Sequence, residues 1–359
     1  MRLLLFLAAA VCWSAPCTTP TPACVQWIQP QPQGSRLLAY SSYPLDGRNE
    51  SVTRAFILLH GTSRDAGDHF QTALAAAFLA DALNNTVIIA PRFAASSGDT
   101  GNGGGSCRDA LAQGEADWSC EVQRPNSWRS GGGELGGKGL TSYDYIDELL
   151  RLLSRREIFP NLRAIVFAGH SAGAQFVIRY QMSNRIHEKL GIPVSYLVAN
   201  SSAYPYLDQL RPTASAQPRN IASAAPGYNP PPASDPPAPF APFGDARNCT
   251  AFDEWPYGLR NRVGYSSRIE DAQLKNQIVA RPVTFLLGGY DILPLAGFDG
   301  SCPAMAQGPT RLARGLAFSR YLHEQYQGQP SVVVVPLCGH NARCMFTSSN
   351  VLPLLFPNR

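Results

Sequence analysis

Charge is scarce in this chain of 359 residues. Charged residues make up 16%, and Lys and Arg (30) barely exceed Asp and Glu (26), which leaves a formal charge of +4. There is no basic stripe and no long run of one sign, so we expect no nucleic-acid partner. Cysteine and histidine never occur with zinc-ligand spacing, which predicts no metal site, and no motif calls for a cofactor.

No hydrophobic run in the chain is long enough to span a membrane, but a short one lies at its start. Met1 and Arg2 precede an apolar stretch over residues 3–11, and small residues follow. The stretch is too short to span a bilayer and is typical of a secretory signal. We predict a signal peptide over residues 1–15, a mature domain over 16–359, and no membrane span. The protein would be secreted, or periplasmic in a bacterium; the alternative is a buried N-terminal helix.

The nine cysteines of the sequence indicate disulfide bonding. Cleavage of the signal would remove Cys12 and leave eight cysteines, and an even number in a secreted chain predicts disulfides, in principle four. Close spacing favours Cys107–Cys120 and Cys338–Cys344. The remainder are Cys17, Cys24, Cys249 and Cys302, left over as Cys17–Cys24 and Cys249–Cys302. Sequence by itself leaves the connectivity open.

Four Asn-x-Ser/Thr sequons, at Asn49, Asn84, Asn200 and Asn248, lean toward a secreted glycoprotein. The last has cysteine in the middle position and is a poor acceptor.

Strand-like and helix-like segments alternate along the chain. Short apolar runs predict strands at residues 37–43, 54–59, 86–90 (stopped by Pro91), 164–168, 194–199, 283–287 and 332–336. Helical spacing predicts helices at 66–83, 142–156 (capped by Thr141 or Ser142), 172–185 and 312–326. This order predicts an α/β fold with a mostly parallel sheet covered on both faces.

Two segments interrupt the alternation and are predicted to be insertions. Residues 94–138 are rich in glycine and serine but lack the setting of a phosphate-binding loop. Residues 201–268 contain the proline-rich stretch 226–242. So long a loop in a compact domain is either a cap over the site or a mobile excursion.

The pentapeptide Gly169-His170-Ser171-Ala172-Gly173 directly follows a predicted strand and precedes a predicted helix. A serine on such a sharp turn can attack a carbonyl carbon. A serine hydroxyl needs a base that is itself oriented by a carboxylate. His340 and Asp291 each follow a later strand, so we expect them to be that base and acid, with Asp299 as the reserve acid.

The oxyanion of such a reaction needs two preorganised donors. We expect one to be the backbone N–H of Ala172 at the start of the helix. The second would be the N–H of Thr62, because Gly61 lets the backbone of His60-Gly61-Thr62 come close.

Together, His60-Gly61-Thr62, the elbow around Ser171, Asp291 and His340 resemble the α/β-hydrolase superfamily in kind and in order. The resemblance extends over about residues 37–357 and implies that Ser171 is the nucleophile, His340 the base, Asp291 the orienting acid, and Thr62 and Ala172 the oxyanion donors. The layout is similar to that of secreted esterases, including feruloyl-esterase-like and polyester-depolymerase-like enzymes.

Aromatic side chains near the predicted site could line it, and we name Trp128, Tyr204 and Tyr290, although core packing is the commoner role for each. The leading hypothesis is a monomeric secreted serine hydrolase that cleaves small or polymeric carboxylic esters through an acyl-enzyme. A peptidase or acyltransferase with the same triad, and a binding module without catalytic activity, are the alternatives.

Overall fold

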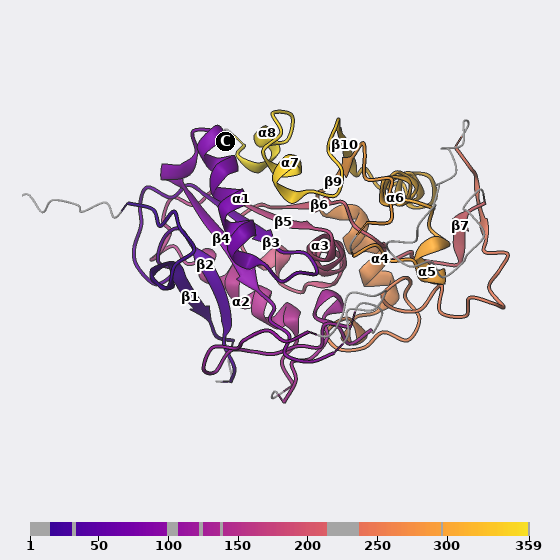
Figure 1. Ribbon diagram of the computed structural model, residues 1–359, viewed down its shortest axis with the longest axis horizontal. Coiled ribbons are helices and arrows are strands. Elements are labelled where there is room, and N and C mark those ends of the chain that lie inside the picture. The colour runs from indigo at the N-terminus through magenta and orange to yellow at the C-terminus, as the bar shows by residue number, and fades with distance from the viewer. Residues whose placement is uncertain are drawn as a thin grey trace, which may run out of the picture.

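The structure, a computed structural model, describes residues 15–30, 34–98, 107–121, 125–136, 139–213, 237–295 and 297–357. Within them an eight-stranded sheet has the order β1-β2-β4-β3-β5-β6-β9-β10 and crosses the middle of the molecule (Figure 1). Its parallel strands are β3 (Arg54–Leu59), β4 (Thr86–Arg92), β5 (Ala164–His170), β6 (Val194–Ala199), β9 (Val283–Gly288) and β10 (Ser331–Val335). The antiparallel strands β1 (Val25–Ile28) and β2 (Leu37–Ser41) complete one edge. The predicted α/β class is therefore confirmed.

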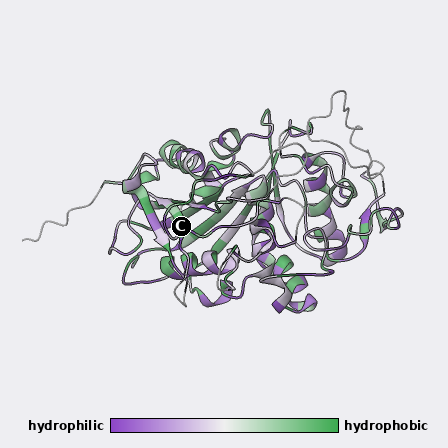
Figure 2. Cartoon of the chain, turned by 60° about the horizontal axis from the view of Figure 1, so that its bottom comes forward, coloured by the Kyte–Doolittle hydropathy of each residue, from purple (hydrophilic) through white to green (hydrophobic). Residues whose placement is uncertain are grey.

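Helices cover both faces of the sheet. One face packs against α2 (Ser142–Leu153), α3 (Ala172–Ser183), α4 (Asp271–Ala280) and α6 (Arg311–Tyr326), and the other against α1 (Ala66–Leu79), α7 (Ala342–Phe346) and α8 (Leu352–Leu355). Side chains of β3 alternate between the two cores, with Ile57 on the first side and Phe56 and Leu58 on the second. The central strands are correspondingly hydrophobic in Figure 2.

Most predicted elements are present, with ends that differ by a few residues. The bounds of β3 and β6 are those predicted. Thr141 caps α2: its side chain accepts the N–H of Asp144, and the Asp144 carboxylate accepts the N–H of Thr141 at 2.8 Å.

The prediction that Pro91 stops its strand was wrong, because β4 continues to Arg92. Pairing of β4 with β3 ends at Ile89, whereas pairing with β2 continues through Pro91 and Arg92. At Pro91 the strand is paired on one side only, where a residue without an N–H is tolerated.

Several elements escaped prediction because their apolar pattern is short or sparse. They include β1, α4, α5 (Cys302–Met305), α7, α8, and the small sheet of β7 (Leu210–Pro212) and β8 (Phe240–Pro242). In α4 only Leu274 and Ile278 are buried, too few to produce a helical period. Short 3₁₀ turns lie at η1 (Pro22–Cys24), η2 (Leu83–Asn85), η3 (Trp128–Ser130), η4 (His187–Lys189) and η5 (Ser266–Arg268).

The two predicted insertions are only partly described. Of the segment 94–138, the described residues include the turn η3 and a buried Trp118. The segment 201–268 sends Tyr206 and Trp255 into the core and forms β7 and β8. Residues 214–236, most of the proline-rich stretch 226–242, and residues 1–14 of the predicted signal lie outside the described ranges.

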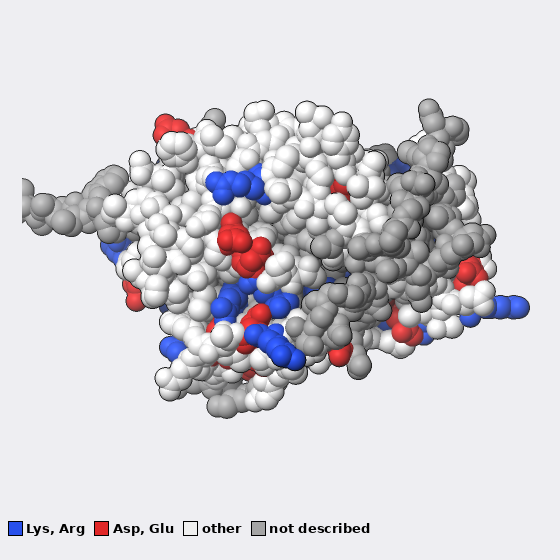
Figure 3. Space-filling model, in the orientation of Figure 1, with Lys and Arg blue, Asp and Glu red and all other residues white. Residues whose placement is uncertain are grey.

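Four disulfides join the eight cysteines in the pairs that spacing and elimination favoured: Cys17–Cys24, Cys107–Cys120, Cys249–Cys302 and Cys338–Cys344. None of the helices in the described ranges has the length and apolar character needed to cross a membrane. On the face shown in Figure 3, charged side chains of both signs lie next to one another and uncharged surface predominates.

Candidate active site

Ser171 occupies a sharp turn between the end of β5 and the start of α3. Its backbone has φ 58° and ψ −115°, a conformation that residues other than glycine rarely adopt. Its N–H donates to the Ala199 carbonyl at 2.9 Å. Such a turn lifts the hydroxyl above the carboxyl edge of the sheet.

The two glycines of the pentapeptide allow this turn to close. A Cβ on Gly169 would lie 2.3 Å from the carbonyl of Gly173, and a Cβ on Gly173 would lie 2.5 Å from the carbonyl oxygen of Leu59. Only residues without a side chain fit where strand, helix and the end of β3 meet.

The structure brings Ser171, His340 and Asp291 together from three separate loops. Oγ of Ser171 lies 2.9 Å from Nε2 of His340, and Nδ1 of His340 lies 2.8 Å from Oδ2 of Asp291. A carboxylate only accepts, so Nδ1–H of His340 donates to Asp291, and Nε2 is left to accept the Ser171 proton. The reserve acid Asp299 lies elsewhere: its carboxylate accepts from the Tyr257 hydroxyl and the Ser301 N–H.

The pKa of His340 is lowered below its usual 6.5, by burial first and then by the positive charge of Arg311, while Asp291 acts in the opposite direction. The imidazole is therefore neutral at neutral pH, as a general base must be.

Arg311, the first residue of α6, was not expected at the site from the sequence. Its Nη1 lies 3.2 Å from Oδ1 of Asp291, and its Nε donates to Ser202 Oγ at 2.7 Å. Both partners of the ion pair are fully buried. No sequence signal points to this arginine, because a helix-starting arginine is ordinarily exposed.

Asn200 was also missed as a site residue, since it was assigned as a sequon. Its Oδ1 accepts the Gly288 N–H at 2.7 Å and its Nδ2 donates to the Gly339 carbonyl at 3.1 Å. The residue is buried, so its sequon assignment is corrected: the nitrogen that would carry a glycan is inside the fold. Asn200 instead ties the ends of β6 and β9 to the loop of His340. Its place at a strand end was the available signal.

Thr62 and Ala172, the expected oxyanion donors, directly follow Gly61 and Ser171 in the chain. Gly61 brings the Thr62 loop against the nucleophile, since a Cβ there would be 3.5 Å from the Cβ of Ser171. Ala172 is the first residue of α3, whose initial N–H groups have no partner inside the helix. Within the described ranges neither the Thr62 nor the Ala172 N–H donates to a protein acceptor.

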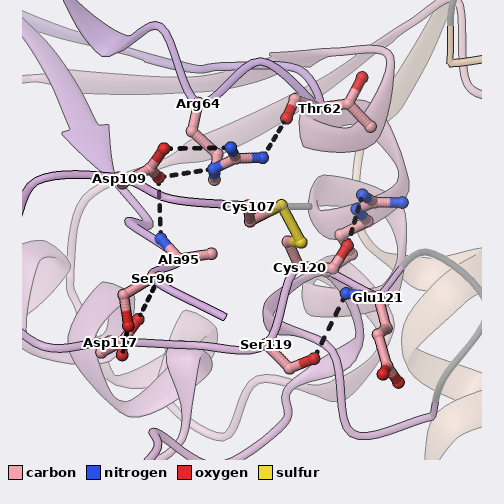
Figure 4. Close-up of a disulfide and its surroundings, with 11 residues drawn as sticks. Thr62, Arg64, Ala95, Ser96, Cys107, Asp109, Asp117, Ser119, Cys120 and Glu121 are labelled. Atoms are coloured by element: carbon pink, nitrogen blue, oxygen red, sulfur yellow. Dashed lines mark hydrogen bonds and ion pairs between the residues drawn. A yellow bond between two sulfur atoms is a disulfide. The ribbon is translucent and has the colours of Figure 1, made fainter. Parts of the chain in front are cut away.

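Part of the segment 94–138 supports the Thr62 loop. The guanidinium of Arg64 donates to the Thr62 carbonyl at 2.6 Å and is paired with Asp109, again at 2.6 Å (Figure 4). Asp109 follows Cys107 by two residues, and the Cys107–Cys120 disulfide lies beside the pair in the same view. The insertion thereby holds the loop from outside.

His60 holds the same loop from inside the core. Its Nε2 accepts the Phe93 N–H at 2.9 Å, so Nδ1 carries the proton and donates to the Gly61 carbonyl, also at 2.9 Å. Burial lowers the pKa of His60 to about 4, which keeps the ring neutral.

The three aromatic residues named from sequence have different surroundings. Trp128 is buried and stacks on Phe93 with ring centroids 5.4 Å apart, and Tyr204 is buried against Phe318 at 4.8 Å. Both therefore have packing roles. Tyr290 is 60% exposed next to Asp291, which leaves it available to substrate.

No group of three His, Cys, Asp or Glu side chains positioned to bind a metal occurs in the part of the chain that is described.

A parallel sheet with a serine elbow after its central strand defines the class of nucleophile-elbow hydrolases. The model of the alpha/beta hydrolase family matches residues 56–351, and the chain belongs to that family. Family membership supports hydrolase activity.

Two solved structures show the same fold at low identity. One is LpqC, poly(3-hydroxybutyrate) depolymerase from Bordetella parapertussis, with 19% identity, a TM-score of 0.53, and coverage of 90% of this chain and 87% of that one. The other is poly(aspartic acid) hydrolase-1 from Sphingomonas sp. KT-1, with 17% identity, a TM-score of 0.54, and coverage of 92% and 97%. No curated protein matches the chain in sequence.

Proposed function

We propose that this protein is a serine hydrolase that cleaves carboxylic esters through an acyl-enzyme, with Ser171, His340 and Asp291 as its triad. The observation that carries the proposal is the continuous hydrogen-bonded path from Oγ of Ser171 through His340 to Asp291, with distances of 2.9 and 2.8 Å. Each group is oriented by the next, which the chemistry requires.

The reaction would proceed in two halves. Oγ of Ser171 attacks the ester carbonyl while its proton passes to Nε2 of His340, and the N–H groups of Thr62 and Ala172 stabilise the oxyanion. Collapse breaks the bond to the alcohol, which leaves with the proton from His340. A water molecule, deprotonated by His340, then attacks the acyl-enzyme. The bond between the acyl carbon and Oγ of Ser171 breaks, the proton on His340 returns to Oγ, and the acid is released.

Ser171→Ala tests the proposal directly. Loss of the nucleophile should reduce kcat on a short p-nitrophenyl ester by about 10⁴-fold or more. A fluorophosphonate should label Ser171 and no other residue. Ser183→Ala is the matched control, because Ser183 is a buried serine of the same helix whose Oγ lies 3.0 Å from Ser266 Oγ.

Three outcomes would contradict the assignment as an ester hydrolase and favour another function. Preferential transfer to an alcohol or amine over water would indicate an acyltransferase, and cleavage of peptides over esters a peptidase. A protein inert toward esters and unlabelled by phosphonates would be a binding module. Two structural neighbours are described as acting on polymers, so the substrate panel should include a polyester beside small esters and a feruloylated sugar.

We further propose that the enzyme is secreted and monomeric and has no nucleic-acid partner. Its chain would consist of a signal peptide over residues 1–15 and one hydrolase domain over 16–359, with insertions at 94–138 and 201–268. Four disulfides fit an oxidising compartment. Mass spectrometry of the protein from culture medium should find that the mature chain begins at Pro16. An uncleaved N-terminus in the cell fraction would contradict secretion, and asparagine glycans should be confined to Asn49, Asn84 and Asn248.

A further inference from the structure

Two guanidinium groups near the elbow, those of Arg129 in η3 and Arg179 in α3, are buried without a carboxylate partner. Each residue is 1% exposed. In the described ranges no carboxylate lies within ion-pair distance of either, whereas buried Arg281 is paired with Glu188. A buried cation without a counter-charge is costly, so these two positions require an explanation.

Hydrogen bonding does not compensate for the missing charge. Arg129 makes one long bond, from Nη2 to the Cys120 carbonyl at 3.4 Å, and its Nε has no partner. Arg179 donates to the Pro256 carbonyl at 3.1 Å and to Gln175 Oε1 at 3.4 Å.

Two other buried arginines make more and shorter hydrogen bonds than Arg129 and Arg179. Arg314 donates to the carbonyls of Gly308, Ser202 and Asp299, all within 2.9 Å. Arg211 likewise makes three bonds to carbonyls, at 2.6 to 2.9 Å, although its Nε has no partner.

The neighbours of Arg129 in the chain extend this polar deficit. Nε1 of Trp128 and Oγ of Ser130 are also buried, and neither has a hydrogen-bond partner among the described residues. Three successive side chains therefore present unused donors in one place. Buried polar groups in folded proteins nearly always have partners, so the cluster indicates a polar ligand.

The charge of that ligand follows from the surroundings. Among the carboxylates in the described ranges, Asp299 is the one whose charge acts on both Arg129 and Arg179. It already accepts a hydrogen bond from the Tyr257 hydroxyl at 2.7 Å. Two guanidinium groups against one carboxylate leave one positive charge uncompensated. Burial, followed by the positive charge of Arg179, lowers the pKa of Arg129 to about 9, and Asp299 acts in the opposite direction.

The elements that carry the two arginines, α3 and η3, also lie next to predicted catalytic groups in the chain or in the core. Gln175 and Arg179 are one and two turns along α3 from Ser171, and helical side chains lean toward the N-terminal end, here toward Ser171. Arg129 lies over the Trp128 ring, 5.5 Å from its centre. His60, whose ring lies 5.0 Å from the same indole, holds the Thr62 loop.

We propose that Arg129 and Arg179 bind a carboxylate of the substrate, so that the preferred substrates are esters that carry a free carboxylate. This inference rests on the proposed ester hydrolysis. A carboxylate is the group that fits, because its two oxygens match the paired donors of a guanidinium and its charge neutralises the excess.

The test compares esters that differ only in the distal charge. For the acyl side these are p-nitrophenyl monoesters of succinic, glutaric and adipic acid, each beside its distal methyl ester; for the alcohol side, para-acetoxybenzoate beside its methyl ester. The native enzyme should prefer the charged member of at least one pair by about 10- to 100-fold in kcat/KM. Arg179→Met and Arg129→Met should each reduce that ratio about tenfold or more.

The ratio is measured on one preparation, so it does not depend on how much of a variant has folded. Arg211→Met is the matched control: it removes an equally buried guanidinium from β7 and should leave the ratio as in the native enzyme. Hydrolysis of neutral esters with no preference for charged ones, or a preference that both variants retain, overturns the arginine proposal alone. Hydrolysis of neither kind of ester overturns the proposed function as well.

Discussion

Arg311 and Asp291 form a fully buried ion pair, in which Nη1 of the arginine lies 3.2 Å from Oδ1 of the carboxylate. The other oxygen of the same carboxylate accepts from Nδ1 of His340. The Asp291 carboxylate is therefore held from both sides, which orients it toward the imidazole and places a positive charge near His340.

Replacing Arg311 should move the pH dependence of activity. The arginine's charge lowers the pKa of His340, so Arg311→Met should raise that pKa. Because the base must be neutral, the acidic limb of kcat/KM should shift to higher pH, with a smaller shift in Arg311→Lys. Arg314→Met, on the same helix but not bonded to Asp291, is the control. An unmoved limb in Arg311→Met would mean that the pair is merely structural.

The turn at Ser171 should not tolerate a methyl group added at Gly173. In Gly173→Ala the new Cβ would meet backbone oxygens of Leu59 and His60 at 2.5 and 2.6 Å. Relief requires the backbone to move, at a cost of about 3 kcal/mol in the free energy of unfolding, and should displace Ser171. Gly244→Ala, where no atom lies within 4 Å of the added Cβ, is the control. Equal thermal stability of the two variants would contradict the close packing.

Removal of Cys249–Cys302 and removal of Cys338–Cys344 should affect stability and activity to different degrees. Cys249–Cys302 joins residues 53 apart, and replacing both cysteines with serine should cost about 4 kcal/mol of unfolding free energy, measured in urea. Cys338–Cys344 joins residues 6 apart and should cost only about 2 kcal/mol. Because it brackets His340, its loss should nevertheless reduce kcat more than loss of Cys249–Cys302. The reverse order of kcat values would be evidence against this role.

Stability should fall in mild acid because of His60. Its pKa is about 4 in the folded protein against an ordinary 6.5, so the unfolded chain binds more protons between these values. The stabilisation is complete above pH 6.5 and is lost as the pH falls toward 4, by about 3 kcal/mol in total.

Urea unfolding at pH 7.5 and pH 4.5 measures this loss. His60→Asn, which keeps one donor and one acceptor, should show a smaller difference between the two pH values. His323→Asn, at an exposed position of α6, should behave as the native protein. A native-sized difference in His60→Asn would assign the pH effect to other groups.

Sequence by itself determined the class of fold and the loops of the candidate site. Those signals are local: apolar period along each strand and helix, the cap at Thr141, and the glycines around Ser171. Parallel strands end at one edge of a sheet, so Ser171, Asp291 and His340 could be predicted to meet from strand order alone.

Only the tertiary structure decided which polar groups surround the site. Asn200 and Gly339 are 139 residues apart, and Arg311 takes its carboxylate from a different loop, so neither pairing has a local pattern. That Arg129 and Arg179 are buried with no carboxylate partner in the described part of the chain is visible only once helix, turn and loop are packed. Hydrophobic periodicity depends on near neighbours in the chain, whereas charge compensation depends on which distant side chains share one buried volume.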